Sequence, residues 1–313
     1  MPKKTQVKKR SPAWRVGLAL AILLAAIYLL QKNWHVVESG LKAAAHADGT
    51  WFSWSLLLMA FTFMIAAAIY GALALHKLKY AQTVLIEISS AFVNRILPSG
   101  IGGLGLHGVY LFKKGHSAAE ATTVISVNNL VGMLAHLFLL AVVITVRPST
   151  FSDFYTHSHF AKSWQVAAFA VGIVAIILVI PKIRRAITRF GYNILSSIRK
   201  LQLWQVMTAF VLALMMTATY TLILFSSVQS IGVNLGILQC FVVFSIGMLL
   251  GTAAPTPGGL VGAEAGLYAG LVGYGVSAAD AAAGVILFRL VSYWIPLIPG
   301  AISVLIARKQ GLV

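Results

Sequence analysis

The sequence predicts an all-α, polytopic membrane protein, and the composition, the apolar runs and the positions of the basic residues all indicate this class. Of the 313 residues, 59% are hydrophobic and 10% are charged, and the mean hydropathy is +0.88. Soluble domains carry about 25% charged residues, so most of this chain is expected to lie in lipid. Polar stretches between the apolar runs are at most about twenty residues long, too short for a separate domain. We therefore expect residues 1–313 to form a single integral membrane domain.

Six apolar stretches are long enough to be membrane spans. They cover residues 16–30, 51–75, 117–146, 164–180, 204–230 and 277–309. The first stretch is similar to a signal peptide, but its candidate cleavage site at 43–45 lies about thirteen residues beyond it, so an uncleaved anchor is expected. Residues 31–50 are interpreted as a polar linker. In residues 183–203, apolar side chains recur at helical spacing opposite arginines, which predicts an amphipathic cytoplasmic interfacial helix.

Two pairs of shorter apolar segments are interpreted as re-entrant helical hairpins. Two full spans would also return the chain to the side it left, and only the length of the segments favours the hairpins. The first pair, 81–97 and 101–112, would extend about 25 Å and about 18 Å as helices, against a hydrocarbon core of about 30 Å. The second pair, 235–250 and 260–274, surrounds the glycine-rich and proline-rich stretch 251–264. Non-helical backbone at membrane depth is tolerated only where protein or a water-filled cavity satisfies its polar groups. These hairpins therefore predict a cavity within the membrane.

The basic residues fix the predicted orientation. The chain has 24 lysines and arginines against 7 acids, a net charge of +17. In the six-span layout, eighteen basic residues lie on the side of the termini and four on the other side. Basic loops remain cytoplasmic, so both termini are expected inside, in a multi-pass protein of the plasma (inner) membrane. Because the charge follows this topology, it does not indicate a nucleic-acid partner.

An internal repeat is the third feature of the predicted fold. Residues 115–121 and 275–281 agree at five of seven positions and share an acid at a sixth. The order of helices and hairpins also repeats, so residues 14–146 and 164–308 are expected to be two copies. Three spans separate equivalent points, so the copies have opposite topology and the hairpins enter from opposite sides. Inverted repeats around discontinuous helices are typical of transporters.

Arg289 is the first candidate substrate-binding residue. It lies eleven residues into the last predicted helix, about 16 Å from the end of that helix, and a charge at this depth is usually functional. Glu264, in the second hairpin, is its expected counter-charge, in a pair that binds substrate or only holds the hairpin against the helix. Asn129 lies 160 residues earlier, at the equivalent position of the first copy, and is predicted to line the same cavity.

Arg95 is the second candidate, at the predicted tip of the first hairpin. It is placed to meet a phosphate, or to cap the carbonyl end of its own half-helix, with Glu87 as a suggested partner. Half-helices that begin after the tip prolines would direct backbone N–H groups at an anion. The remaining candidates are the tip residues Pro98, Gly102, Thr256, Pro257, Gly258 and Gly259. For His107 and His136, a satisfied buried position is the favoured interpretation over proton relay.

No sequence motif indicates catalysis. The chain has no Walker motif, no His-Glu-x-x-His and no plausible Ser/His/Asp set, and Cys240 is its single cysteine. The His-x-His at 157–159 is too weak a pattern for a metal site. We therefore expect neither an enzyme nor a cofactor or metal requirement.

Several motifs resemble the lysylphosphatidylglycerol synthase transmembrane-region family. They are Pro257-Gly-Gly-Leu-Val-Gly-Ala-Glu264, Gly275-Val-Ser, Phe288-Arg289, Ile295-Pro-Leu-Ile-Pro-Gly300 and, earlier, Leu97-Pro-Ser-Gly-Ile-Gly-Gly103. The resemblance covers nearly the whole chain and implies a stand-alone relative of a flippase region that moves aminoacylated phosphatidylglycerol. It carries Glu264 and Arg289 over at matching positions. The chain departs from the family at Leu106-His107, where a charged region is common.

The expected function is therefore that of a lipid flippase or lipid transporter. Arg289, and with it Arg95, would bind the phosphate of a phospholipid or polyprenyl-phosphate-type lipid. Glu264 would orient Arg289, meet a cationic head group or carry a proton. The alternatives are a small-solute secondary transporter and a non-transporting membrane partner of a lipid-modifying enzyme. A homo-oligomer is a further partner that the sequence leaves open.

Overall fold

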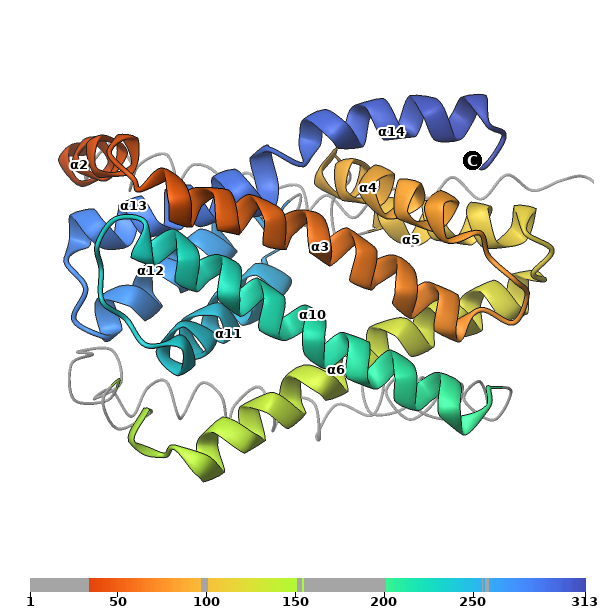
Figure 1. Cartoon of the computed structure of the whole chain (residues 1–313), viewed down its shortest axis with the longest axis horizontal. Helices are drawn as coiled ribbons and strands as arrows, with labels where there is room; N and C mark the ends of the chain where they lie inside the picture. Colours follow the sequence, from red (N-terminus) through yellow and green to blue (C-terminus); the bar gives the residue numbers. More distant parts are fainter. Residues whose placement is uncertain (1–33, 97–100, 151–153, 155–200, 255, 257–258) are drawn as a thin grey trace, which may run out of the picture.

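The computed structural model describes residues 34–96, 101–150, 154, 201–254, 256 and 259–313, and throughout these ranges the regular elements are helices (Figure 1). The predicted helical class is confirmed. Four helical stretches are long and apolar enough to cross a membrane: α3 (Gly49–Leu73), α6 (Ala118–Val146), α10 (Leu203–Gln229) and Ala278–Lys309. They match four of the six predicted spans. The other two, at 16–30 and 164–180, and nearly all of the predicted interfacial helix at 183–203, lie outside the described residues.

Helices α3 and α10 form the central antiparallel pair of the bundle (Figure 1). At one end, the backbone N–H of Asp48, the N-cap of α3, donates to the carbonyl oxygen of Ser230 at 2.6 Å. At the other end, the side chain of Gln205 donates to the carbonyl oxygen of Ala72 at 3.0 Å. These bonds tie the start of each helix to the end of the other.

Each helix of this central pair is followed in the chain by two short helices, which pack side by side as a hairpin. The first hairpin is α4 (Tyr80–Ile96) with α5 (Ile101–Lys113), and the second is α11 (Ile237–Ala253) with α12 (Gly262–Gly273). The first begins soon after α3 ends and the second soon after α10 ends. Because α3 and α10 are antiparallel, the hairpins enter the bundle from opposite ends (Figure 1).

The seam between α11 and α12 consists of glycines. Gly262, Gly266 and Gly270 repeat every fourth residue on one face of α12, and Ala263 and Leu267 of the same helix lie against glycines of α11. A Cβ atom added at Gly266 would lie 2.8 Å from the Cα of Gly247. Small residues at this spacing allow two helices in a membrane to approach closely.

The two similar heptapeptides adopt the same backbone structure. Gly115 and Gly275 have φ values of +91° and +81°, which glycine adopts without a steric penalty, and each ends a short helix. Ser117 then caps the N-terminus of α6, and Ser277 caps α13 (Ala278–Arg289), each accepting a bond from the backbone N–H of an acid three residues on.

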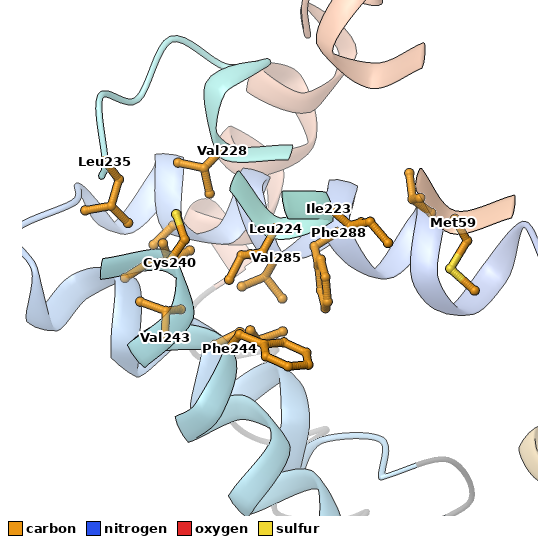
Figure 2. Packing of buried hydrophobic residues seen from close by; sticks show 14 residues of the cluster. Met59, Ile223, Leu224, Val228, Leu235, Cys240, Val243, Phe244, Val285 and Phe288 are labelled. Carbon is orange, nitrogen blue, oxygen red and sulfur yellow. The ribbon is translucent and has the colours of Figure 1, made fainter. Parts of the chain in front are cut away.

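A hydrophobic core connects the second hairpin to the spans (Figure 2). Met59 from α3, Leu224 from α10, Phe244 from α11 and Phe288 from α13 are at most 5% exposed. By contrast, only 17% to 39% of the most apolar windows of the four candidate spans is buried. The remaining apolar surface is what a lipid-facing bundle requires.

The stretch expected to be a polar linker is instead largely helical. Helix α2 (Trp34–Ala45) packs against α13. Its Glu38 and Lys42 form an ion pair of 2.8 Å at helical spacing, and it ends in three alanines. Alanine, glutamate and lysine are strong helix formers, and such pairs stabilise the helix further. Polarity indicated exposure correctly, but it does not exclude a helix.

His116 ties together the two turns at the ends of α3 and α5. Its Nε2 atom accepts bonds of 3.2 Å from the backbone N–H groups of Leu75 and His76, and its Nδ1 atom donates to the carbonyl oxygen of Leu111 at 3.1 Å. Only a neutral imidazole with its proton on Nδ1 satisfies all three contacts. The side chain is 1% exposed.

We expect the matched variants Gly266→Ala and Gly71→Ala to change stability in opposite directions. At Gly71 nothing lies within 4 Å of an added Cβ, so the helix should gain up to about 1 kcal/mol. At Gly266 the overlap with Gly247 should cost about 1–3 kcal/mol. Thermal unfolding of the purified protein in detergent measures both, and equal effects at the two sites would contradict the glycine seam.

Acid pH should weaken the tie made by His116. Burial lowers the pKa of this imidazole below its ordinary value of 6.5, and nearby His76 lowers it further. The unfolded chain therefore binds the proton first, so the stabilisation is complete above about pH 6.5 and declines as the pH falls below it. The melting temperature of wild type should decrease over this window more than that of His116→Gln. His46→Gln, which changes an exposed histidine, serves as the control.

Candidate functional site

The partly buried ion pair between Arg289 and Glu264 forms one side of the candidate site. Arg289, the last residue of α13, donates from Nε to Oε1 of Glu264 at 2.6 Å. The side chain of Arg289 is 12% exposed and that of Glu264 is 30% exposed. Glu264 lies in the first turn of α12, where the helix dipole favours a negative charge. The structure therefore contains the ion pair that the sequence predicts.

The helix that carries Arg289 is broken immediately afterwards. Within the span Ala278–Lys309, a π-helical turn, η1 (Leu290–Trp294), separates α13 from α14 (Leu297–Lys309), a distortion that the sequence analysis does not predict. The physical reason is Pro296, which lacks an N–H group and whose ring clashes with the carbonyl four residues earlier, at Ser292. The N–H of Ile295 bonds instead to Leu290, five residues back. Such π-turns are frequent at functional sites.

Arg95 supplies the bond that the broken helix lacks. This residue ends α4, and its Nη2 atom donates to the carbonyl oxygen of Ser292 at 2.5 Å, while Nη1 donates to Ala91 of its own helix at 2.5 Å. The first bond lies within α4, and the second, to Ser292, is a contact that the sequence did not predict. Through it, the end of α4 in the first hairpin is fixed to the break in the last helix.

Both arginines lie against one aromatic ring. The guanidinium carbon of Arg95 is 5.0 Å from the ring centre of Tyr293, and that of Arg289 is 4.5 Å from it. A cation over an aromatic face is attracted by the ring quadrupole. Tyr293 therefore holds together two like charges that come from different parts of the chain.

Several polar atoms of this cluster have no hydrogen-bond partner within the protein. They are Nε of Arg95, Nη2 of Arg289, Oγ of Ser292 and Oε2 of Glu264, and they are the four such buried side-chain atoms found across the described ranges. Buried polar groups are normally bonded, so a concentration of exceptions indicates a site for a ligand or water. Three of the atoms are donors, two of them on positively charged groups. This is the donor set that binds a phosphate or another oxyanion.

A second polar cluster lies within the first hairpin. Glu87 of α4 contacts His107 of α5, with 2.8 Å between Oε1 and Nε2, and these side chains are 11% and 6% exposed. The suggestion that Glu87 pairs with Arg95 is therefore wrong, because a closer partner is available on the adjacent helix. A cavity of about 190 Å³ adjoins the pair, and Asn128 and Asn129 of α6 line it. Asn129 thus lies beside Glu87 and His107, at a place apart from the contacts of Arg289.

The remaining predicted site residues have backbone roles where the structure describes them. Oγ of Thr256 donates to the carbonyl oxygen of Leu260 at 2.5 Å. A Cβ atom at Gly259 would lie 2.6 Å from the carbonyl oxygen of Gly251, and one at Gly102 would lie 2.7 Å from Val93. These residues shape the hairpins, and they present no side-chain donor to a ligand. Pro98, Pro257 and Gly258 lie outside the described residues.

The sequence did not point to Ser292 or Tyr293, and it indicated Glu87 and His107 only separately, without their pairing. A signal for Ser292 was available, because a proline four residues after a polar residue in a membrane helix leaves that residue's carbonyl free. No comparable sequence signal indicated that Glu87 contacts His107. His136, the other membrane histidine, packs against the rings of Phe241 and Phe244. In the part of the chain that the structure describes, no group of three or more His, Cys, Asp or Glu side chains is placed to hold a metal ion.

The fold and this site define a multi-pass helical membrane protein with a buried basic cluster at a broken helix. The chain belongs to the lysylphosphatidylglycerol synthase TM region family, which matches residues 14–300. The resemblance read from the hairpin motifs is thereby confirmed. No curated protein matches the chain.

A double-mutant cycle should show that Arg289 and Glu264 depend on each other. Glu264→Gln and Arg289→Gln should each lower the free energy of unfolding by about 2 kcal/mol, somewhat less than for a fully buried pair because Glu264 is partly exposed. The double variant should cost about 1 kcal/mol less than the sum of the two. Unfolding in a denaturing detergent measures all four proteins. Strict additivity would show that the pair contributes no coupling energy.

Proposed function

We propose that this protein is a lipid flippase or lipid transporter that moves a phosphate-bearing head group across the plasma membrane. Membership of the family indicates a membrane lipid-related function. The observation that carries the proposal is the set of three unpartnered buried donors on Arg95, Arg289 and Ser292. A lipid phosphate would satisfy these donors, while the acyl or prenyl tails remain in the bilayer.

The charges of the site suit a lipid phosphate. Two guanidinium groups and one carboxylate leave one positive charge uncompensated in a low-dielectric environment, where an unpaired charge is costly. A phosphodiester or phosphomonoester anion compensates that charge and accepts several hydrogen bonds at once. Glu264 keeps Arg289 in place through Oε1, and its second oxygen is left to accept a bond from an amine or hydroxyl of the head group.

The arrangement of the helices supports an inverted repeat with two re-entrant hairpins. The order of a long helix, a short hairpin and a capped long helix occurs twice. Helices α3 to α6 have 25, 17, 13 and 29 residues. Helices α10 to α12 have 27, 17 and 12 residues, and the last span follows them. Helices α3 and α10, which precede the hairpins in the two proposed copies, are antiparallel. Each hairpin helix is shorter than the roughly 20 residues that a full span needs.

The distribution of charge supports the orientation, with six spans and both termini in the cytoplasm. In the described part of the chain, basic residues gather at the end where α3, α5 and α14 finish, namely Lys77, Lys79, Lys113, Lys114, Arg308 and Lys309. The opposite end carries Lys42 and Arg147, together with Glu38, Asp48 and Asp280. The positive-inside rule assigns the first end to the cytoplasm.

Polar cavities adjoin α4, the helix that carries Arg95. Two cavities, of about 140 Å³ and about 190 Å³, share Glu87, Ser90 and Asn94 of α4 in their walls. Thr62 of α3 and Tyr220 of α10 add hydroxyl groups to the smaller one. Hydroxyl and amide groups replace water around a polar head group, which lowers the cost of its passage.

Substitution of Arg289 tests the proposal. In vesicles that contain the purified protein, translocation of fluorescent phosphatidylglycerol, of its aminoacylated form and of polyprenyl phosphate is followed with an impermeant quencher. Arg289→Ala should reduce transport of the substrate lipid at least tenfold, because hydrogen bonds to a charged group contribute about 1.5–3 kcal/mol each. Arg308→Ala, which removes an arginine at the end of α14, is the control and should transport normally.

The outcomes separate the alternatives. Unimpaired translocation by a folded Arg289→Ala protein would contradict the assignment of the site. Saturable uptake of a water-soluble substrate, with no movement of lipid, would instead favour the small-solute transporter. A protein that moves neither, and that co-purifies with a lipid-modifying enzyme, would favour the membrane-partner alternative.

A further inference from the structure

The Glu87–His107 pair lies outside the phosphate site, and its geometry requires a proton. Nδ1 of His107 is 2.8 Å from the carbonyl oxygen of Gly103, a group that can only accept, so Nδ1 carries hydrogen. Nε2 faces Oε1 of Glu87 at 2.8 Å. A neutral imidazole protonated at Nδ1 would present a lone pair to a carboxylate at this distance, which is repulsive. One further proton must therefore lie between the two atoms, on the imidazole or on the carboxyl group.

Cavities beside Glu87 allow that proton to be exchanged, and neighbouring side chains hold the pair in place. Two cavities have Glu87 in their walls, and amide and hydroxyl groups line them. The ring of Tyr70 stacks on the imidazole, with 4.2 Å between the ring centres and 9° between the planes. Asn94 accepts a bond of 2.6 Å from the N–H of Gly103, which ties α4 to α5 without using the pair. The hairpin thus keeps a contact that does not depend on the proton.

Few other charges face the pair. The titratable groups around it are Tyr70 of α3, Tyr110 of α5, Tyr220 of α10 and, further along α4 itself, Arg95. Helix α14 also packs against α4, but its basic residues, Arg308 and Lys309, lie in its last turn. Tyrosines are neutral near pH 7, so loss of the proton leaves the Glu87 carboxylate with no adjacent cation.

We propose that Glu87 and His107 form a proton-binding site that is linked to the binding of a phosphate-bearing lipid at Arg95 and Arg289. Glu87 lies eight residues before Arg95 on α4, about 12 Å along the helix. When the pair loses its proton, the new negative charge repels a phosphate and attracts the Arg95 guanidinium. When the pair gains the proton, that repulsion is removed. Proton and lipid therefore favour each other's binding, and this linkage is reciprocal.

The linkage rests on the proposed function, but the proton site can be tested without lipid. Protein labelled with ¹⁵N-histidine contains eight imidazoles, and the signals absent from His107→Gln belong to His107. Recorded from pH 5 to pH 8, the Nε2 signal of His107 should shift as the pair gains and loses its proton. In Glu87→Gln that titration should move to lower pH, because the imidazolium has lost its anionic partner. An Nε2 signal that stays constant over this range would overturn the proton site.

The second measurement tests the linkage with short-chain phosphatidylglycerol, titrated into the protein in a neutral detergent. Wild type should bind about tenfold more tightly at pH 5 than at pH 8, the effect of one charge about 12 Å away at an effective dielectric constant near 20. Glu87→Gln should bind at pH 8 about as tightly as wild type does at pH 5. A merely structural role for Glu87 predicts weaker or unchanged binding in this variant, so the gain in affinity distinguishes the two.

Glu38→Gln, which neutralises an exposed glutamate of α2, is the matched control. It should leave the affinity for the lipid unchanged at both pH 5 and pH 8. Equal affinity of wild type at both pH values, or a Glu87→Gln protein no tighter than wild type at pH 8, would overturn the linkage. Failure of the proposed function has a different signature, in which wild type binds the lipid no better than Arg289→Ala at either pH. In that case the ¹⁵N titration still decides the proton site.

Discussion

The carbonyl group of Ser292, which has no partner within its own helix, determines how the candidate site is assembled. Pro296 removes the helical partner of this carbonyl, and a carbonyl at membrane depth has no water to replace it. Arg95 donates the missing bond from another helix. An arginine is thereby held at the break with its Nε atom still unused, next to Tyr293 and Arg289. The irregular backbone therefore accounts for the position of Arg95 beside the second arginine.

The two hairpins reach this break from opposite ends of the bundle and contribute different chemistry. The second supplies an acid, Glu264, through the first turn of α12. The first supplies a base, Arg95, through the last turn of α4. The ends of the α-helical segments are where their backbone dipoles and side chains are available to a ligand. The candidate site is therefore not symmetric, because each hairpin contributes a charged group that the other does not.

Much of the fold could be predicted from the sequence because its signals are local. Apolar run length predicted α3, α6, α10 and the last span, and the serine caps at 117 and 277 predicted where two helices begin. The Arg289–Glu264 pair followed from the cost of an unpaired charge in lipid. The helix over residues 34–45 was missed because polarity was taken for irregular structure. The partners of Arg95 and Glu87 were missed because they depend on which helices become neighbours, and no spacing along the chain encodes that.

The contacts that hold the two hairpins differ in how they respond to their surroundings. The seam between α11 and α12 is steric, since it depends on glycines that leave no room for a side chain. The seam between α4 and α5 is polar, through Asn94 with Gly103 and Glu87 with His107. Steric contacts are insensitive to pH and to bound ions, whereas polar contacts are not. The second hairpin is therefore held by shape, whereas the hairpin that carries Arg95 is held by groups that can exchange hydrogen bonds and protons.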